Sequence, residues 1–156
     1  MAMIIEGEER IEAPIARVWE ALNDADTLKA CIPGCESLEK TGDNQLAAVV
    51  TLKIGPIKAK FNGEVELRNL KPPHSYTIEG EGKGGIAGFA KGGADVTLTE
   101  ESPTVTILTY EAKADVGGKI AQLGSRLITS TSKKLAGQFF SSLNEQISGN
   151  KTEASA

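Results

Sequence analysis

The sequence predicts an α+β fold in which one antiparallel sheet packs against a single long helix near the C-terminus. Residues 38–115 alternate between apolar and polar side chains, with turn residues between the runs, which is typical of antiparallel strands. Residues 118–147 instead repeat apolar side chains every three or four positions, which indicates one apolar stripe on an amphipathic helix. A helix of this length, about 45 Å at roughly 1.5 Å per residue, needs a broad surface to lie across.

The composition excludes several classes of function. The 156 residues correspond to one domain, and the aromatic content of 4% with 17 glycines predicts a core of aliphatic and small side chains. The net charge of −4 argues against a nucleic-acid-binding surface, which needs clustered Lys and Arg. No run approaches the roughly 18 apolar residues of a membrane span, and no basic segment precedes an apolar run at the N-terminus. We therefore expect a cytoplasmic protein.

Residues 3–13 form the first predicted strand, with Ile5, Gly7 and Ile11 on its apolar side. Glu9 falls on the same side. We favour the interpretation that Glu9 lies at a solvent-exposed strand end. If it points inward instead, it needs a partner, because an unpaired buried carboxylate has a raised pKa.

Two short helices are predicted to follow this strand. Pro14 fits the first turn of one helix, which runs through Trp19, a residue that we expect in the core. Asp24 can cap the second helix, which stops at Pro33 and Gly34. Such a pair commonly closes one end of a sheet.

Six strands are predicted between the short helices and the long one. Their small inward residues, which include Gly80, Gly82, Gly92 and Ala94, cluster at one end of the inner face of the sheet. Either the long helix approaches closely there, or the sheet curves away and leaves a cavity, which is the interpretation that we favour. The clearest runs are residues 46–54, 57–70, 75–83, 86–99 and 104–116.

The outward positions of residues 57–70 carry charges of both signs. They are Lys58, Lys60 and Arg68, opposed by Glu64 and Glu66. A strand face of this kind is typically solvated, so we predict a mixed-charge outer surface.

The long helix is predicted to start after Gly117 and Gly118 and to stop at Gly149 and Asn150, since glycine is common at helix ends. We therefore divide the chain into a folded domain at residues 1–148 and a polar, disordered tail at residues 149–156. The tail is too short to act as a membrane anchor.

No combination of residues predicts a catalytic or metal site. Residues 80–85 match the letters G-x-G-x-x-G, but a strand follows them where a dinucleotide fold needs a helix. Cys31, Cys35 and the single His74 do not supply the four ligands of structural zinc. A disulfide between the two cysteines is unexpected in a reducing compartment. We predict no catalytic residue, no metal and no covalently bound cofactor.

Two segments carry a specific resemblance to a known family. They are the turn Cys31-Ile32-Pro33-Gly34-Cys35 and the sequence GGKIAQLGSRL at residues 117–127. Together they resemble the G-subunit family of carbon monoxide dehydrogenase, and the resemblance extends from residue 3 to about residue 148. That family belongs to the START and Bet v 1-like superfamily, which includes polyketide cyclases. The resemblance implies a helix-grip fold, a curved seven-stranded antiparallel sheet around a long C-terminal helix.

The resemblance also implies a non-catalytic role beside a carbon monoxide dehydrogenase or related molybdenum hydroxylase, with a non-covalently bound quinone or lipid. Transient contact with the inner face of the membrane is a further expectation. Two alternatives are a ligand-free assembly or membrane-recruitment factor for that enzyme, and a polyketide cyclase-like or aromatase-like enzyme. We predict an apolar pocket between sheet and helix, lined by Ile32 at the mouth, Phe61, Tyr76 and Tyr110 on the sheet, and Leu123, Arg126 and Leu127 on the helix.

Overall fold

The computed structural model describes the backbone of residues 2–155 and the side chains of residues 2–147. The strands are β1 (Ala2–Ile11), β2 (Cys35–Gly42), β3 (Gln45–Ile54), β4 (Ile57–Lys71), β5 (Ser75–Lys83), β6 (Phe89–Ser102) and β7 (Val105–Gly117). The α-helices are α1 (Ile15–Leu22), α2 (Ala25–Cys31) and α3 (Ser125–Ser155), and the 3-10 helices are η1 (Gly85–Ala87) and η2 (Lys119–Leu123).

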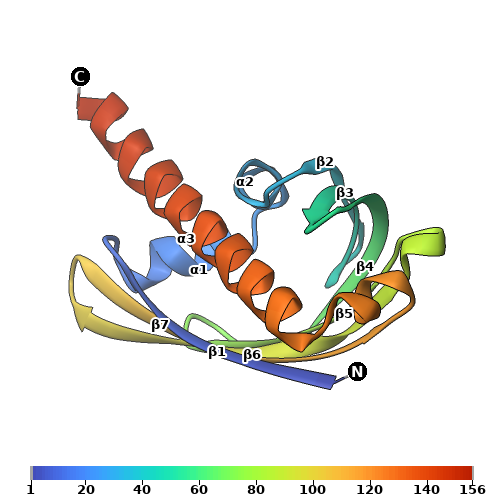
Figure 1. The fold of residues 1–156 in the computed structure, drawn as a ribbon. Coiled ribbons are helices and arrows are strands. Elements are labelled where there is room, and N and C mark those ends of the chain that lie inside the picture. Colours follow the sequence, from blue (N-terminus) through green and yellow to red (C-terminus); the bar gives the residue numbers. More distant parts are fainter. Residues whose placement is uncertain (1, 156) are drawn as a thin grey trace.

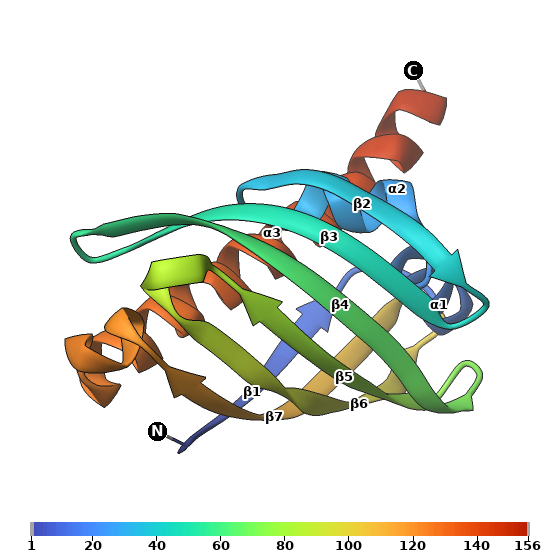
Figure 2. The ribbon, with the colours of Figure 1, turned by 90° about the vertical axis from the view of Figure 1, so that its right-hand side faces the viewer.

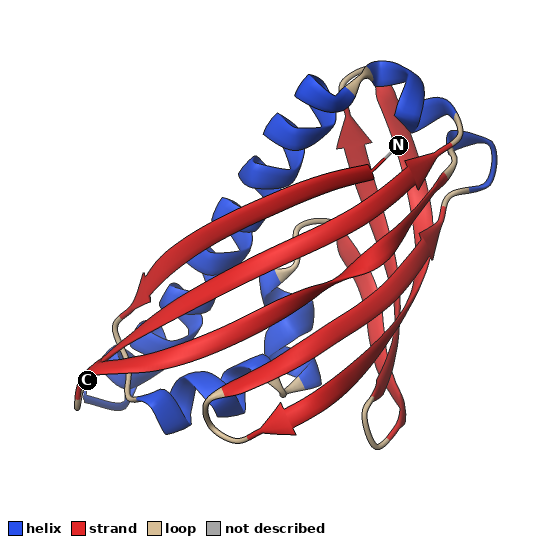
Figure 3. Cartoon of the chain, turned by 90° about the horizontal axis from the view of Figure 1, so that it is seen from below, coloured by secondary structure: helices blue, strands red, loops and turns tan. Residues whose placement is uncertain are grey.

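The seven strands form one antiparallel sheet in the order β1-β7-β6-β5-β4-β3-β2. The sheet is bent into a trough, and α3 lies diagonally across its concave side (Figure 1). Viewed from below, the strands lie in front and α3 lies behind them (Figure 3). The predicted α+β helix-grip fold is confirmed.

The alternation of side chains in β1 follows the sequence prediction. Ile11 is buried and Gly7 is half-buried, whereas Glu6 and Glu8 are exposed on the outer face. Glu9 lies opposite Leu108, two residues inside the end of the β1–β7 ladder, and it is half-buried on the inner face. The interpretation that Glu9 lies at a solvent-exposed strand end is therefore wrong, because the pairing with β7 continues past it.

The two short helices follow β1 as predicted. Pro14 is extended, with φ −60° and ψ 149°, so it caps α1 and does not belong to its first turn. The Asp24 carboxylate accepts hydrogen bonds from the backbone N–H of Thr27 at 3.1 Å and from the Thr27 hydroxyl at 2.6 Å, which confirms its role as the cap of α2.

The long helix differs from the prediction at both ends. It starts at Ser125 and not at Gly118, because Gly124 has φ 92° and separates η2 from α3. Glycine adopts such a positive φ without steric cost, and it therefore breaks the helical path here. At the other end α3 continues to Ser155, past Gly149 and Asn150, since glycine weakens a helix by about 1 kcal/mol without having to end it. The predicted disordered tail, residues 149–156, lies outside the residues whose side chains the structure describes.

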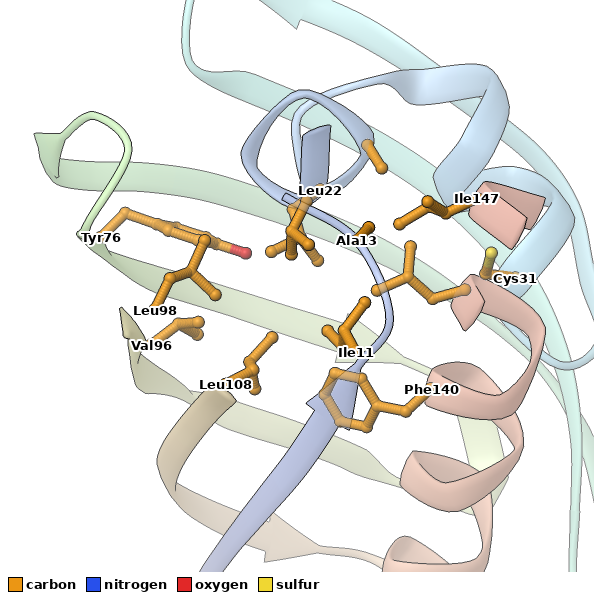
Figure 4. Close-up of a cluster of buried hydrophobic side chains, with 13 residues drawn as sticks. Ile11, Ala13, Leu22, Cys31, Tyr76, Val96, Leu98, Leu108, Phe140 and Ile147 are labelled. Atoms are coloured by element: carbon orange, nitrogen blue, oxygen red, sulfur yellow. The ribbon is translucent and has the colours of Figure 1, made fainter. Parts of the chain in front are cut away.

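Two separate clusters of buried apolar side chains lie at opposite ends of the trough. We name the one beside α1 and α2 the large cluster (Figure 4) and the one beside η1 and η2 the small cluster. In Figure 2 the β3–β4 turn, η1 (yellow-green) and η2 (orange) lie together at the end away from α1. The buried members of the large cluster are Ile11, Ala13, Val18, Ala21, Leu22, Cys31, Tyr76, Val96, Leu98, Leu108, Phe140, Leu143 and Ile147. Those of the small cluster are Met3, Phe61, Ala87, Val116, Ile120 and Ile128.

Thr106 ties β7 to the link between β1 and α1. Its side chain is fully buried, and its hydroxyl donates a 2.8 Å hydrogen bond to the carbonyl of Ala13. Thr106→Val keeps the shape but removes the donor, so we expect the free energy of unfolding to fall by about 1–3 kcal/mol. Thermal denaturation measures this loss. The matched control is Thr109→Val on the exposed face of β7, which should change the free energy by less than about 0.5 kcal/mol. Equal losses in the two variants would contradict the assignment.

Candidate functional site

Between the buried members of the two clusters, the inner face of the sheet is only half-buried, although Leu67 and Ile78 pack against the large cluster and Ala90 packs against the small one. The strand register joins inner-face residues into rows, such as Leu46, Val65, Gly80, Gly92 and Ala114, each paired with the next. We name three adjacent rows the open strip, because all of their members keep part of their surface accessible. These rows are Leu67, Ile78, Ala94 and Ala112; Leu46, Val65, Gly80, Gly92 and Ala114; and Ala48, Gly63, Gly82 and Ala90.

Most residues of the open strip are Ala or Gly, so the strip itself contributes little side-chain volume above the sheet. A Cβ atom added to Gly82 would meet no atom within 4 Å. The sequence predicts that these small residues cluster at one end of the inner face, and the register places them toward the η1 end of the sheet, where Gly82 pairs with Ala90 one position before the end of the β5–β6 ladder. Beyond them, η1 and η2 fold over the sheet and, with Phe61, close that end, which strand alternation alone does not reveal.

Helix α3 carries small side chains opposite the open strip. Ile128, Ser132, Ala136 and Phe140 are spaced four apart and share one side of the helix. Ile128 is buried in the small cluster and Phe140 in the large cluster. Ala136 is half-buried and packs against the large cluster, whereas Ser132 is half-buried and belongs to neither cluster. The helix is therefore anchored at two places and leaves the middle less tightly packed. This arrangement favours the predicted cavity and argues against a close contact between the helix and the sheet.

The predicted lining residues do not form one group. Tyr76 is buried in the large cluster, and Tyr110 packs partly against it. Phe61 lies in the small cluster at the other end. Leu127 packs against the β3–β4 turn, where a Cβ on Gly55 would lie 2.9 Å from its Cδ2 atom. The open strip therefore separates the two tyrosines from Phe61.

The remaining predicted residues lie further from the strip. Ile32 is half-buried and caps the C-terminus of α2. Leu123 is half-buried at the end of η2. Arg126 is exposed in the first turn of α3 and makes no ion pair with a described residue. Contacts of these three residues with a ligand stay predictions.

Aromatic rings form the border between the open strip and the large cluster. The rings of Tyr110 and Phe140 stack with their centroids 5.6 Å apart and an angle of 24° between their planes, which links the sheet to α3. The Tyr110 ring lies over Gly7 of β1, where a Cβ would come within 2.6 Å of its Cε1 atom. Trp19 and Tyr76 meet edge to face at 5.4 Å, so Trp19 packs in the core as predicted.

Three titratable side chains gather at this border. Burial raises the pKa of the Glu9 carboxyl. Burial also raises the pKa of Tyr110, and the nearby charge of Glu9 raises it further. Burial holds the pKa of Tyr76 well above its usual value. No hydrogen bond or ion pair joins any of the three side chains to a described residue. The sequence interpretation missed Glu9 as a site residue, although its position in the alternation placed it on the inner side.

The raised pKa of Glu9 makes stability depend on pH. The folded protein keeps this proton to a higher pH than the unfolded chain does, so the carboxylate lowers stability above the folded pKa and costs nothing well below the ordinary value of 4.5. We expect Glu9→Gln to raise the melting temperature slightly at pH 7, with a difference from wild type that shrinks toward pH 4. Thermal denaturation across this range measures the difference. Glu8→Gln on the exposed outer face is the control, and a lower melting temperature of Glu9→Gln at pH 7 would reveal a favourable partner for Glu9.

A groove with a volume of about 840 Å³ lies on the outer face of the sheet. Its lining includes Glu64, Glu66, Lys91 and Lys113. Beside it, Arg68 pairs with Glu66 and with Glu79, each at 3.1 Å. The prediction of a mixed-charge outer surface is confirmed. An apolar ligand would have to displace solvated charges there, so this groove does not suit one.

The remaining features of the chain that bear on function are its thiols, its metal-binding groups and its apolar helices. Cys31 is buried, Cys35 is half-buried, and both thiols are free. No group of three or more His, Cys, Asp or Glu side chains within the described part of the chain could hold a metal ion. The described part also contains no helix with the length and apolar character needed to cross a membrane.

Comparison with known proteins gives one family match and many similar structures. The family model for the G subunit of carbon monoxide dehydrogenase (CoxG) matches residues 7–148. The crystal structure of a conserved protein from Geobacillus kaustophilus is 32% identical with a TM-score of 0.90, over 94% of this chain and 96% of that one. Comparison with curated protein sequences gives no match.

More distant structures share the fold. A START superfamily protein from Mycobacterium smegmatis is 11% identical with a TM-score of 0.72, over 94% of this chain and 97% of that chain. The Zhui aromatase/cyclase from Streptomyces sp. R1128 is 10% identical with a TM-score of 0.70, over 95% and 94%. Likeness at these identities concerns the fold alone.

Proposed function

Because the chain belongs to the CoxG family of carbon monoxide dehydrogenase subunits, we propose that it is a non-catalytic accessory protein that binds a hydrophobic small molecule, a quinone or a lipid, between its sheet and α3. The open strip is the main support for this proposal. Its Leu, Ile and Val side chains keep accessible surface in the folded chain, although a domain of this size ordinarily buries such residues. A ligand that covered them would gain about 25 cal/mol per Å² of apolar surface.

The family name supports a partner for this function. We propose that the chain serves a carbon monoxide dehydrogenase or a related molybdenum hydroxylase, for which a lipid-soluble quinone would be a suitable electron acceptor. Affinity capture from the source cell tests this part of the proposal. We expect an oxidoreductase subunit among the captured proteins, and repeated capture without one would contradict the partnership.

Mass spectrometry of an organic extract tests ligand binding. The protein is purified from a host that makes quinones, and a second sample is incubated with quinone-containing vesicles before extraction. We expect about one quinone or lipid molecule per chain in at least one of the two samples. Clean extracts from both would contradict the binding function and favour a ligand-free assembly factor.

A further inference from the structure

An otherwise apolar inner face carries three polar groups at one border of the open strip. Tyr76 pairs with Val96, Val96 pairs with Tyr110, and Tyr110 pairs with Gly7, so the two tyrosines lie in one row across the sheet. Glu9 is two residues beyond Gly7 on the same face of β1 and is therefore a diagonal neighbour of Tyr110. Tyr110 of β7 and Glu9 of β1 are therefore neighbours on adjacent strands, whereas Val96 of β6 separates Tyr76 of β5 from Tyr110.

The Tyr76 hydroxyl is held in an apolar setting without a partner in the described chain. The residue is 4% exposed, and no hydrogen bond to its hydroxyl is present among the described residues. Every fully buried polar side-chain atom of the described residues has a partner, so the hydroxyl oxygen of Tyr76 must keep some accessible surface. In Figure 4 it points toward Leu22 of the large cluster. A hydroxyl in this position is free to bond to a ligand atom.

The position of Tyr110 is fixed by its neighbours. Gly7 opposite has no side chain, and the ring of Tyr110 occupies the space that a Cβ would need. Phe140 of α3 stacks on the same ring. Because the ring is held between β1 and α3, its hydroxyl lies over Gly7, two residues from Glu9 on the same face of β1.

We propose that Glu9 and Tyr110, with Tyr76 two strands away in the same row, form the polar end of the hydrophobic site and bind a hydroxyl group of the ligand. The Glu9 carboxylate accepts a hydrogen bond from the ligand O–H, and a tyrosine hydroxyl donates one to the ligand oxygen. This inference rests on the proposed function and adds the class of ligand: an apolar molecule with a hydroxyl at one end, such as an alkylphenol or a hydroquinone. An oxidised quinone can accept a hydrogen bond from a tyrosine hydroxyl but offers no donor to Glu9, so the site should hold the reduced form more tightly than the oxidised one.

A pair of matched probes tests the proposal. 4-Octylphenol and its methyl ether 4-octylanisole share the same apolar body, but only the phenol can donate a hydrogen bond. Trp19, the single tryptophan, contacts Tyr76 and can report binding of either probe to the full chain by fluorescence. We expect the wild-type protein to bind the phenol about tenfold more tightly than the ether, which corresponds to about 1.4 kcal/mol.

Substitutions assign this preference to the named residues. Glu9→Met removes the acceptor and should bring the two dissociation constants within about twofold of each other without weakening binding of the ether. Tyr110→Phe removes a donor that the oxygen of either probe can accept from, so it should weaken binding of both probes and leave their ratio largely unchanged. Glu8→Met, on the outer face of the same strand, is the matched control and should keep it. If Glu9→Met does not fold, Glu9→Gln replaces it, and its uncharged acceptor should give an intermediate preference.

The outcomes separate this proposal from the proposed function. Equal wild-type affinity for the two probes would overturn the hydroxyl site and leave hydrophobic ligand binding intact. A preference that Glu9→Met leaves undiminished, or Glu9→Gln where that variant replaces it, would overturn the role of Glu9. Binding of neither probe would overturn the proposed function and the hydroxyl site together.

Discussion

Ala94→Phe is expected to abolish binding of the hydrophobic ligand while the protein stays folded. Ala94 is half-buried in the open strip and lies directly opposite Ala112 of β7. A phenyl ring there occupies volume that the ligand needs, and it buries apolar surface of its own. We expect binding at least about 30-fold weaker, equivalent to about 2 kcal/mol, with a melting temperature equal to or above that of the wild type. Extraction with mass spectrometry and thermal denaturation measure the two effects.

Two substitutions of the same kind serve as controls. Ala47→Phe places the ring on the outer face of β3, where it should not affect ligand content. Ala21→Phe places it in the large cluster, where Ala21 is 2% exposed and overpacking should cost about 1–3 kcal/mol. If Ala94→Phe destabilised the protein as much as Ala21→Phe does, the open strip would be a packed contact with the helix and not a binding site.

The strands and their faces could be predicted from the sequence because a strand alternates with a period of two. The predicted strand at residues 75–83 coincides with β5, and the inner position of Tyr76 follows from it. The same alternation placed Glu9 inward. An unpaired inward carboxylate is costly, which argues against that signal, but Glu9 is half-buried on the inner face and burial raises the pKa of its carboxyl.

The break before α3 could not be predicted from periodicity. Residues 119–123 continue the apolar spacing of the helix, but Gly118 and Gly124 both have positive φ. Gly118 lies so close to Gly88 of the η1 region that a Cβ at either position would collide with the other segment. These conformations depend on contacts between segments that are distant in the sequence, and the spacing of apolar side chains does not reveal such contacts.

The candidate site was predicted only in part for a related reason. Alternation shows that Phe61, Tyr76 and Tyr110 face inward, but it does not show where along each strand α3 crosses the sheet. The crossing buries Phe61 in one cluster and Tyr76 in the other, and the strip between them stays open. The pairing of the first strand with the last one brings Glu9 to Tyr110, and only the three-dimensional structure supplies that register.

Leu143→Ala is expected to cause the largest loss of stability. Leu143 has no exposed surface and joins α3 to the large cluster. Removing its side chain should lower the free energy of unfolding by about 2–5 kcal/mol, through lost burial and the cavity left behind. For a domain of this size, the melting temperature should fall by roughly 2–4 °C for each kcal/mol, measured by thermal denaturation.

Leu135→Ala is the matched control on the same helix, because Leu135 lies between the two anchoring points and is half-buried. If the middle of α3 spans an open space, this side chain has lost less contact with water on folding, and its truncation should cost only about 1 kcal/mol or less. A bound hydrophobic ligand should raise the stability of the wild-type protein more than that of Leu135→Ala, because the ligand would cover Leu135. Equal losses for the two variants without ligand would mean that the middle of the helix is packed as tightly as its C-terminal anchor, and the space proposed for the ligand would not exist.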